Sequence, residues 1–442
     1  MKKIMPACLV FLFLFMNFGG CLPANAATPD KAIPIFNGQL ALTADRRYND
    51  VRTVANGWVA VGELYTAQGD ALIAQFDTQG NEVWEQSFGG SDWDEADTVT
   101  EVSGGYIVSA SCASNDGDLS GLKQDTAGIK TGVTAKYDKN GNLLWIKELS
   151  LSAAVGNDGG FIAVCGDKSA AGADDALSLV QFDADGNVVW TKPMGDSLNL
   201  YDNTNTLMIS KMFKQPDGYL LFGTTSLVDS SFGDAQSGPG FMASLSADGM
   251  VLWQKALSVD QISDVIVTTD GILALGMTFA DIPEACIEKY DFSLNLMWET
   301  RYKPSDGQVT LNKALEVGTD FYITGGMFDN PSKAFIIGID ESGNLFWDTG
   351  LQGDDADSVS YTNIFLTDKG FAVQESGSYS GQCSFLLYIV PAKANTRHMG
   401  IAAEIALWGL CAAIVVGGIV ASLPIKWGAK GKKRKSLSKR RS

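Results

Sequence analysis

The feature that most constrains the fold is a short phrase, FDTQGNEVW at residues 76–84, that returns along the chain. Further copies end at Trp145, Trp190, Trp253, Trp298 and Trp347. A second phrase, a turn followed by alternating apolar residues as in GGYIVSA, lies between them and starts at Gly57, Gly105, Gly160, Gly218, Gly271, Asp320 and Gly370. A repeat of about 50 residues with several short strands per unit is typical of a β-propeller. The seven starts therefore predict seven blades.

The second unit shows the four strands that one blade needs. We assign DEADTVTEV to strand a, GGYIVSAS to b, GVTAKYD to c and NLLWIKEL to d, counted from the propeller axis outward. The D-x-x-G-N phrase joins c to d, where an aspartate such as Asp138 bonds the turn backbone and the glycine adopts a positive φ. Because the phrase recurs wherever this hairpin is needed, we interpret its aspartates as turn residues rather than as calcium ligands.

The seventh unit lacks a tryptophan phrase, and its outermost strand must come from elsewhere. The distance in sequence from Phe36 to Gly57 equals that from Trp84 to Gly105. Phe36 is therefore expected to occupy the tryptophan position, in an N-terminal strand that pairs with the last c strand. Such closure removes open sheet edges. The predicted fold class is all-β: a seven-bladed β-propeller over residues 27–393, closed by the N-terminal strand.

The repeat also resembles a known family. In AQFDTQGNEVW, the residues Ala74, Asp77, Gly80 and Trp84 match the repeats of bacterial secreted β-propellers of the quinoprotein-like, tryptophan-docking group. Those repeats carry A-x-D-x-x-T-G-x-x-x-W between the same two strands; here the spacing differs by one and the threonine is missing. The resemblance implies a propeller whose blades dock through tryptophan. Quinoprotein dehydrogenases also use adjacent cysteines, and because this chain has no Cys-Cys pair, that activity is not inferred.

The two ends of the chain predict secretion and membrane anchoring. Residues 1–26 combine a basic start, an apolar stretch and the small-residue site ANAA, which is typical of a signal peptide. Lipid attachment at Cys21 is the alternative. A stalk at 394–403 leads to a predicted transmembrane helix at 404–425, and a basic tail follows at 426–442. The positive-inside rule then predicts a single-pass plasma-membrane protein whose propeller lies outside the cell.

Small residues lie four apart along the predicted span, at Gly409, Ala413, Gly417 and Ala421. Such a stripe allows two transmembrane helices to approach closely, so self-association through this face is one hypothesis. Small residues are common in membrane spans, and the alternative is that the stripe has no partner.

Charge and residue types exclude several functions. Residues 27–400 hold 50 Asp and Glu against 22 Lys and Arg, a balance of −28, which argues against nucleic acid as a partner. The one histidine, His398, excludes histidine-based triads and metal clusters. The dispersed cysteines of the body are expected to be buried thiols, with a Cys112–Cys165 disulfide as the alternative.

One loop resembles the first half of an EF-hand calcium loop. DGDLSG at 116–121 places oxygen ligands at alternate positions before a glycine turn, and no acid occupies the twelfth position. The candidate Ca²⁺ ligands are Asp116, Asp118, Ser120 and Asp125. The alternative is a solvated acidic loop. No other cofactor is indicated by the sequence.

Acids also occur near the starts of strand a, at Asp50, Asp97, Asp264 and Asp357. Because strand a is innermost, these acids are expected near one mouth of the central channel. They either hydrogen-bond the neighbouring blade or receive a cation or basic ligand.

Long connections between strands b and c, and between d and the next a, mark one face of the propeller as the expected binding face. The ligand-face candidates are Asp174, Asp175, Tyr201, Phe232 and Asp234. The favoured function is a membrane-anchored extracellular binding module for a protein, glycan or cation. The opposite face, which carries the short a–b and c–d turns, is then expected to lie toward the membrane. The alternatives are a lyase or glycoside hydrolase that uses paired carboxylates, or a purely structural envelope protein.

Overall fold

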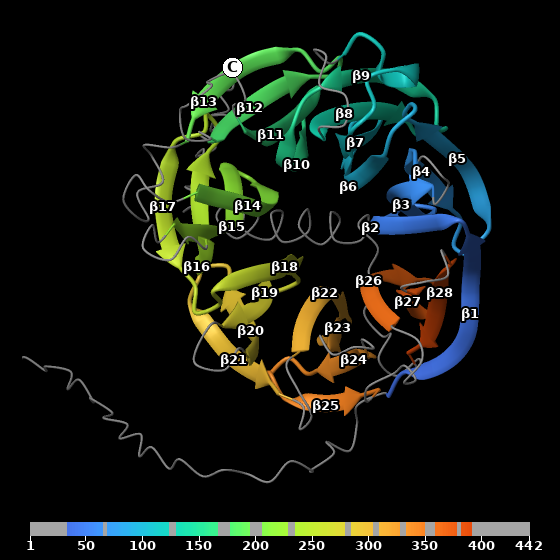
Figure 1. Cartoon of the computed structure of the whole chain (residues 1–442). Helices are drawn as coiled ribbons and strands as arrows, with labels where there is room; N and C mark the ends of the chain where they lie inside the picture. Colours follow the sequence, from blue (N-terminus) through green and yellow to red (C-terminus); the bar gives the residue numbers. More distant parts are fainter. Residues whose placement is uncertain are drawn as a thin grey trace, which may run out of the picture.

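The computed structural model describes residues 33–64, 69–122, 130–166, 177–194, 206–228, 235–278, 284–303, 309–327, 333–349, 359–377 and 382–390. These residues form seven antiparallel four-stranded sheets set around a central axis (Figure 1). The predicted seven-bladed β-propeller is thereby confirmed. The described ranges contain no helix that is long and apolar enough to cross a membrane. The predicted signal peptide, stalk, transmembrane helix and tail lie outside these ranges.

Each blade is built from four consecutive strands, except the seventh. The innermost strands are β2 (Arg46–Val54), β6 (Asp94–Val102), β10 (Leu151–Asn157), β14 (Thr206–Gln215), β18 (Gln261–Thr268), β22 (Val309–Val317) and β26 (Val359–Thr367). The second strands are β3 (Gly57–Leu64), β7 (Gly105–Cys112), β11 (Gly160–Gly166), β15 (Gly218–Val228), β19 (Gly271–Thr278), β23 (Asp320–Met327) and β27 (Gly370–Gly377).

The two outer strands of each blade complete the sheet. The third strands are β4 (Ala71–Phe76), β8 (Thr131–Asp138), β12 (Leu177–Asp183), β16 (Ala235–Ser246), β20 (Glu284–Asp291), β24 (Lys333–Ile339) and β28 (Gln382–Ile389). The outermost strands are β5 (Glu82–Phe88), β9 (Leu143–Glu148), β13 (Val188–Pro193), β17 (Val251–Ala256), β21 (Leu296–Tyr302), β25 (Leu345–Asp348) and, from the N-terminus, β1 (Ile35–Ala44). The strands predicted for the second unit agree with β6 to β9 within one or two residues.

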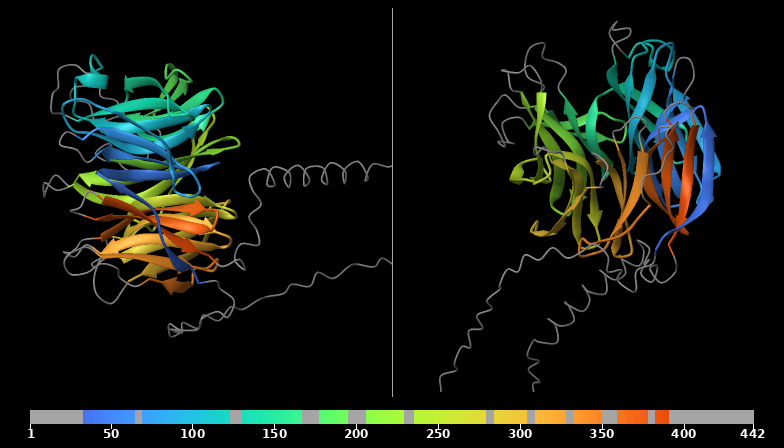
Figure 2. Two further views of the ribbon diagram at one scale, coloured as in Figure 1. Left: turned by 90° about the vertical axis from the view of Figure 1, so that its right-hand side faces the viewer. Right: turned by 60° about the horizontal axis from the view of Figure 1, so that its bottom comes forward.

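The ring closes as the sequence predicted, because β1 pairs antiparallel with β28. In Figure 2 these two strands run side by side at the edge of the disc. Aromatic rings seal the first blade against the seventh: Trp58 stacks on Phe76 at 5.4 Å and meets Phe365 at 4.8 Å between ring centroids. Burial of such large side chains is the main source of stability at this seam.

Phe36 differs in register from the tryptophans that it was expected to replace. Phe36 lies opposite Tyr388 of β28. In the second blade, Trp145 lies opposite Lys136 of β8. The position of β28 that is equivalent to Lys136 is the residue just before Tyr388, so Phe36 is displaced by one position. The cause is an irregularity between Phe36 and Gln39, where β1 shifts by one step against β28. The Phe36 ring packs on Tyr388 at 5.6 Å between centroids and stays 56% exposed.

The repeated phrase joins neighbouring blades as well as neighbouring strands. The Trp84 indole of the first blade lies against Gly141 in the c–d turn of the second, and Trp145 lies against Gly186 of the third. Each turn glycine has a positive φ, and a Cβ atom on either would come within 3 Å of the indole. Glycine is therefore required both by the backbone and by the docked ring. Where glycine is lost, Leu294 takes a φ of 64°.

Side chains of the turn aspartates are fully used within the hairpin. Asp138 Oδ1 accepts hydrogen bonds from the backbone N–H groups of Asn140 and Asn142 at 2.8 Å, and its Oδ2 accepts one from the Asn142 side chain. Asp77, Asp183 and Asp340 accept the same set in their own turns. This hydrogen bonding agrees with the interpretation of the phrase as turn chemistry.

The two faces of the disc carry different connections. Gly105 pairs with Asp138 and Gly370 with Ile389, so the a–b and c–d turns and the end of β28 share one face, which we call the tight-turn face. At the other end of the same strands, Cys112 pairs with Thr131. The 113–130 connection therefore leaves from the opposite face, the b–c face.

Candidate functional site: a charged cavity between the inner strands

Every innermost strand carries one bulge at a polar residue. At that point the register against the second strand shifts by one, and the extra residue has no ladder partner. The bulge residues are Asn49, Asp97, Ser152, Ser210, Ser263, Asn312 and Thr362. The residues that follow the bulges are Asp50, Thr98, Ala153, Lys211, Asp264, Lys313 and Asn363. The bulges thus place one side chain from each blade, of five residue types in all, at equivalent points around the axis.

Two of the predicted channel acids, Asp50 and Asp264, occupy this equivalent position. Asp50 Oδ2 accepts the backbone N–H of Val99 at 3.1 Å, and Asp264 Oδ2 accepts that of Ala314 at 3.1 Å. In both cases the donor lies in the innermost strand of the next blade. Both carboxylates are buried, and a buried carboxylate without such donors would be costly. Each one therefore links its blade to the next.

Three cations accompany these carboxylates. Arg52 Nε lies 3.0 Å from Asp50 Oδ2, Lys211 Nζ lies 2.8 Å from Asp264 Oδ1, and Lys313 Nζ lies 3.9 Å from the same oxygen. We call these five groups the channel charge cluster. Three cations against two carboxylates leave one positive charge in excess, although the protein as a whole carries −18.

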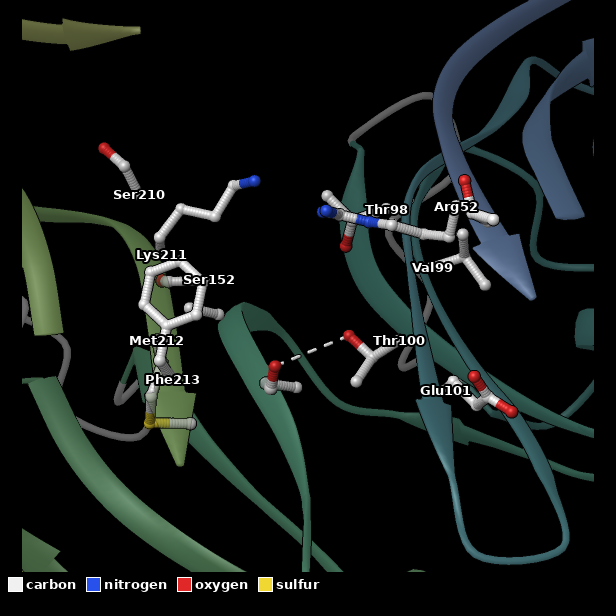
Figure 3. A pocket seen from close by; sticks show the side chains of 13 residues that line it. Arg52, Thr98, Val99, Thr100, Glu101, Ser152, Ser210, Lys211, Met212 and Phe213 are labelled. Carbon is white, nitrogen blue, oxygen red and sulfur yellow. Dashed lines mark hydrogen bonds between the residues drawn. The ribbon is translucent and has the colours of Figure 1, made fainter. Parts of the chain in front are cut away.

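A cavity of about 250 Å³ lies between Arg52 and Lys211. It is lined by the inner strands of the first four blades, β2, β6, β10 and β14. The strands between the two cations carry small side chains, Thr98 and Ala153, at the position after the bulge, and this leaves the space open. Figure 3 shows the Lys211 amine and the Arg52 guanidinium pointing toward each other across it. Arg52 stays 40% exposed there and Lys211 14%.

Two groups of this cluster, Lys211 and Asp264, have shifted pKa values. Burial lowers the pKa of Lys211 to about 8; the Asp264 carboxylate opposes this, and the charges of Arg52 and Lys313 reinforce it. Burial acts to raise the pKa of Asp264, but Lys211, Lys313 and the Ala314 N–H outweigh it and hold the pKa below its usual range. Lys211 is therefore a buried ammonium that holds its proton less tightly than in water, even with the Asp264 carboxylate beside it.

The remaining predicted channel acids lie apart from this cluster. Asp97 is a bulge residue whose carboxylate accepts the Ser111 hydroxyl at 2.7 Å, and burial raises its pKa. Asp357 lies outside the described residues. A carboxylate-based enzyme would need a close pair of acids, one of them with a raised pKa. Asp264, held in ion pairs with a lowered pKa, does not supply that acid.

The predicted calcium loop includes a short 3₁₀ turn, η1 (Gly117–Leu119), and its acids bond the neighbouring 89–91 loop. Asp116 Oδ1 accepts the Ser91 N–H at 2.8 Å, and Asp118 Oδ2 accepts the Gly89 N–H at 3.4 Å. Ser120 is exposed, and Asp125 lies outside the described residues. These bonds anchor the loop to the neighbouring 89–91 loop, and calcium at this loop stays a prediction.

Two further carboxylates that the sequence did not single out lie beside this loop. Asp94 accepts the N–H groups of Gly90 and Ser114 at 3.0 and 3.1 Å. Burial raises the pKa of Asp70, and the charges of Asp94 and Asp118 raise it further. Asp70, Asp94 and Asp118 together make this corner of the b–c face strongly negative.

Within the described ranges, one group of side chains has the spacing of metal ligands: Cys286, Glu288 and Glu299. Both of its carboxylates already have protein partners, however. Glu288 accepts the Tyr290 hydroxyl at 2.8 Å, and Arg301 pairs with Glu299 at 2.7 Å. Burial raises the pKa of the Cys286 thiol to about 12, which disfavours the thiolate that a metal requires.

Three of the four body cysteines, Cys112, Cys165 and Cys286, agree with the expectation of buried thiols. Cys165 and Cys286 are buried free thiols in β11 and β20. Cys112 is buried in β7, and no disulfide joins it to Cys165. The alternative of a Cys112–Cys165 bridge is therefore not realised.

The ligand-face candidates Asp174, Asp175, Tyr201, Phe232 and Asp234 lie outside the described residues, as does the small-residue stripe of the predicted span. They stay predictions.

Sequence reasoning missed the cations Arg52, Lys211 and Lys313. The signal was available in the chain itself. When the seven inner strands are aligned on their bulges, Lys211, Lys313, Asp50 and Asp264 fall at the same position. Opposite charges at one position of neighbouring blades indicate an ion pair between those blades.

Comparison with solved structures finds chains of similar shape. Drosophila Plexin A in complex with Semaphorin 1b is 8% identical over 80% of this chain and 88% of that one, with a TM-score of 0.48. The C-terminal WD40 domain of Sif2 is 10% identical over 82% and 98%, with a TM-score of 0.44. BBS1N in complex with ARL6DN is 9% identical over 83% and 100%, with a TM-score of 0.47. No family model matches the chain, and a search of curated proteins gives no match. The fold therefore rests on the strand order of this chain, and the resemblance to the quinoprotein-like group stays a prediction.

Proposed function

We propose that the protein is a membrane-anchored interaction module that presents the b–c face of its propeller to a partner outside the cell. The observation that carries this proposal is the closure of the ring. Because Ile35 pairs with Ile389, the chain enters and leaves the propeller side by side on the tight-turn face. The sequence after residue 390 contains the predicted stalk and span, which favours an orientation with this face toward the membrane.

The same geometry favours the opposite face as the one that meets the partner. The longest connections between b and c strands join strand ends there, and long insertions on one face of a repeat array are typical of binding surfaces. The negative corner formed by Asp70, Asp94 and Asp118 favours a partner with a basic or cationic contact surface.

Orientation is tested by proteolysis of intact cells that express the full chain. Release of propeller peptides by added protease, with the tail at 426–442 protected, supports the proposal. Complete protection of the propeller, or digestion of the tail, contradicts it. A chain that ends at Thr396 should leave the membrane fraction, and its retention there would argue against the anchor.

The binding face is tested by a matched pair of photo-crosslinking positions in the second blade. Ser120 is exposed on the b–c side and Asn140 is exposed in a tight turn. Crosslinks to another extracellular protein are expected from Ser120 and not from Asn140. Crosslinks from Asn140 alone would assign binding to the tight-turn face and refute the proposed orientation.

A further inference from the structure

The channel charge cluster is unusual because two of its cations converge on open space. Like charges repel, and a folded protein normally turns them apart or places a carboxylate between them. Here Arg52 and Lys211 face each other across the cavity (Figure 3). Each is also paired with one buried carboxylate, Asp50 or Asp264, which accepts a backbone N–H from the next blade.

We propose that this cavity binds a small oxyanion, held between the guanidinium of Arg52 and the ammonium of Lys211. This inference concerns the propeller axis and is independent of the interaction proposed for the b–c face.

The chemistry of the lining suits such a ligand. Asp50 engages Arg52 through Nε, and the terminal nitrogens extend into the cavity, where they form the planar fork that recognises a carboxylate or tetrahedral oxyanion. Lys211 adds a second charge from the facing wall. The hydroxyl groups of Thr98 and Ser152 line the space between and supply further hydrogen-bond donors, whereas the Thr100 hydroxyl donates to the Ala154 carbonyl.

Size and charge limit what can enter. A volume of about 250 Å³ is below the range of ~300–1,000 Å³ that drug-sized ligands occupy, so the ligand is small. Glu101 is the one carboxylate on the lining, and it forms an ion pair with Lys139. Exposed charges act over only ~8 Å at physiological ionic strength, so the lining groups outweigh the acidic surface.

The test is calorimetry on the full chain in detergent micelles, with sulfate and with succinate as separate probes at constant ionic strength in chloride. Three variants accompany the wild type. Lys211→Met removes one cation of the site, Thr98→Leu fills the cavity without changing charge, and Lys303→Met removes a lysine from the outer part of the fifth blade as a control for net charge.

Saturable binding of either probe by the wild type and by Lys303→Met, weakened on the order of tenfold or more in Lys211→Met and in Thr98→Leu, supports the proposal. The probe that binds more tightly identifies the ligand as tetrahedral or carboxylate. Absence of binding by the wild type overturns the proposal. Equal binding by all folded variants, or equal loss in Lys303→Met, also overturns it. Because the two site variants lie on different strands and change different properties, a folding failure of one leaves the other decisive.

Discussion

Docking of one blade on the next through tryptophan and glycine makes a quantitative prediction. Gly141 has a φ of 83°, and a Cβ atom there would lie 2.7 Å from Cδ2 of the Trp84 indole in the preceding blade. Gly104, in a tight turn of the same blade, has a φ of 82° and no heavy atom within 4 Å of its Cβ position. Gly141→Ala and Gly104→Ala therefore share the backbone strain and differ in the clash.

The expected magnitudes follow from these two terms. A left-handed φ costs alanine about 1–2 kcal/mol, and the stiffer unfolded chain returns about 0.4–1 kcal/mol. Gly104→Ala should therefore lower the free energy of unfolding by about 1 kcal/mol or less. Gly141→Ala must also displace the indole, and overpacking of this kind costs about 1–3 kcal/mol more.

The assay is urea unfolding of the full chain, followed by far-ultraviolet circular dichroism, for each alanine variant with and without Trp84→Ala. Since the extra cost arises from the indole, the two glycine variants should differ in the presence of Trp84 and become equal in its absence. Equal costs with Trp84 in place would refute the docking argument. A difference that persists without Trp84 would assign the extra cost to the turn itself.

Three further predictions concern ionisable groups. Hydrogen bonds within the turns lower the pKa of four turn aspartates below the ordinary 3.8. Their contribution to stability is therefore present above about pH 4 and is lost as the pH falls further. In urea titrations at a series of acidic pH values, the difference in free energy of unfolding between Asp138→Asn and the wild type should become smaller below that pH. Lys211 has a folded pKa of about 8 against an ordinary 10.5, and the other four groups of the channel charge cluster surround it. Its burial therefore lowers the free energy of unfolding in full below pH 8. That free energy should rise between pH 8 and 10.5 in the wild type, and Lys211→Met should remove this component of the rise. If the 116–121 loop holds calcium, millimolar Ca²⁺ should raise the melting temperature of the wild type but not of Asp118→Asn, and equal shifts would reject that loop as the site.

Local signals carried most of the fold. The turn aspartate, the positive-φ glycine and the tryptophan act within a few residues of one another or on the adjacent blade, so their spacing revealed strand boundaries and blade number directly. Counting from Phe36 to Gly57 also located the closing strand. It could not reveal the shift of β1 between Phe36 and Gln39, because that irregularity depends on how the chain passes Tyr388 from the far end of the sequence.

The site was less accessible for a physical reason. The sequence singled out Asp264 only as an acid near a strand start. The structure shows it as the partner of Lys211, which extends from the preceding blade and places its Nζ 2.8 Å from Asp264 Oδ1. That contact spans 53 positions in sequence and exists because the inner strands of consecutive blades, β14 and β18, pack side by side. Periodicity within one strand cannot indicate it.

A comparison among the seven blades shows where the chain departs from its own repeat. The turn phrase is nearly uniform, since every copy must close the same hairpin, and the turns at Gly141, Gly186 and Gly343 also receive the indole of the preceding blade. The position after each inner bulge is different in kind: it holds aspartate twice, lysine twice, and threonine, alanine and asparagine once each. A scaffold requirement would favour one residue type in all seven places. The arrangement instead groups Lys211, Asp264 and Lys313 on consecutive blades and leaves Thr98 and Ala153 small. The asymmetry of this position therefore opens the space that Lys211 enters, and Arg52, two residues after Asp50, faces it from the first blade.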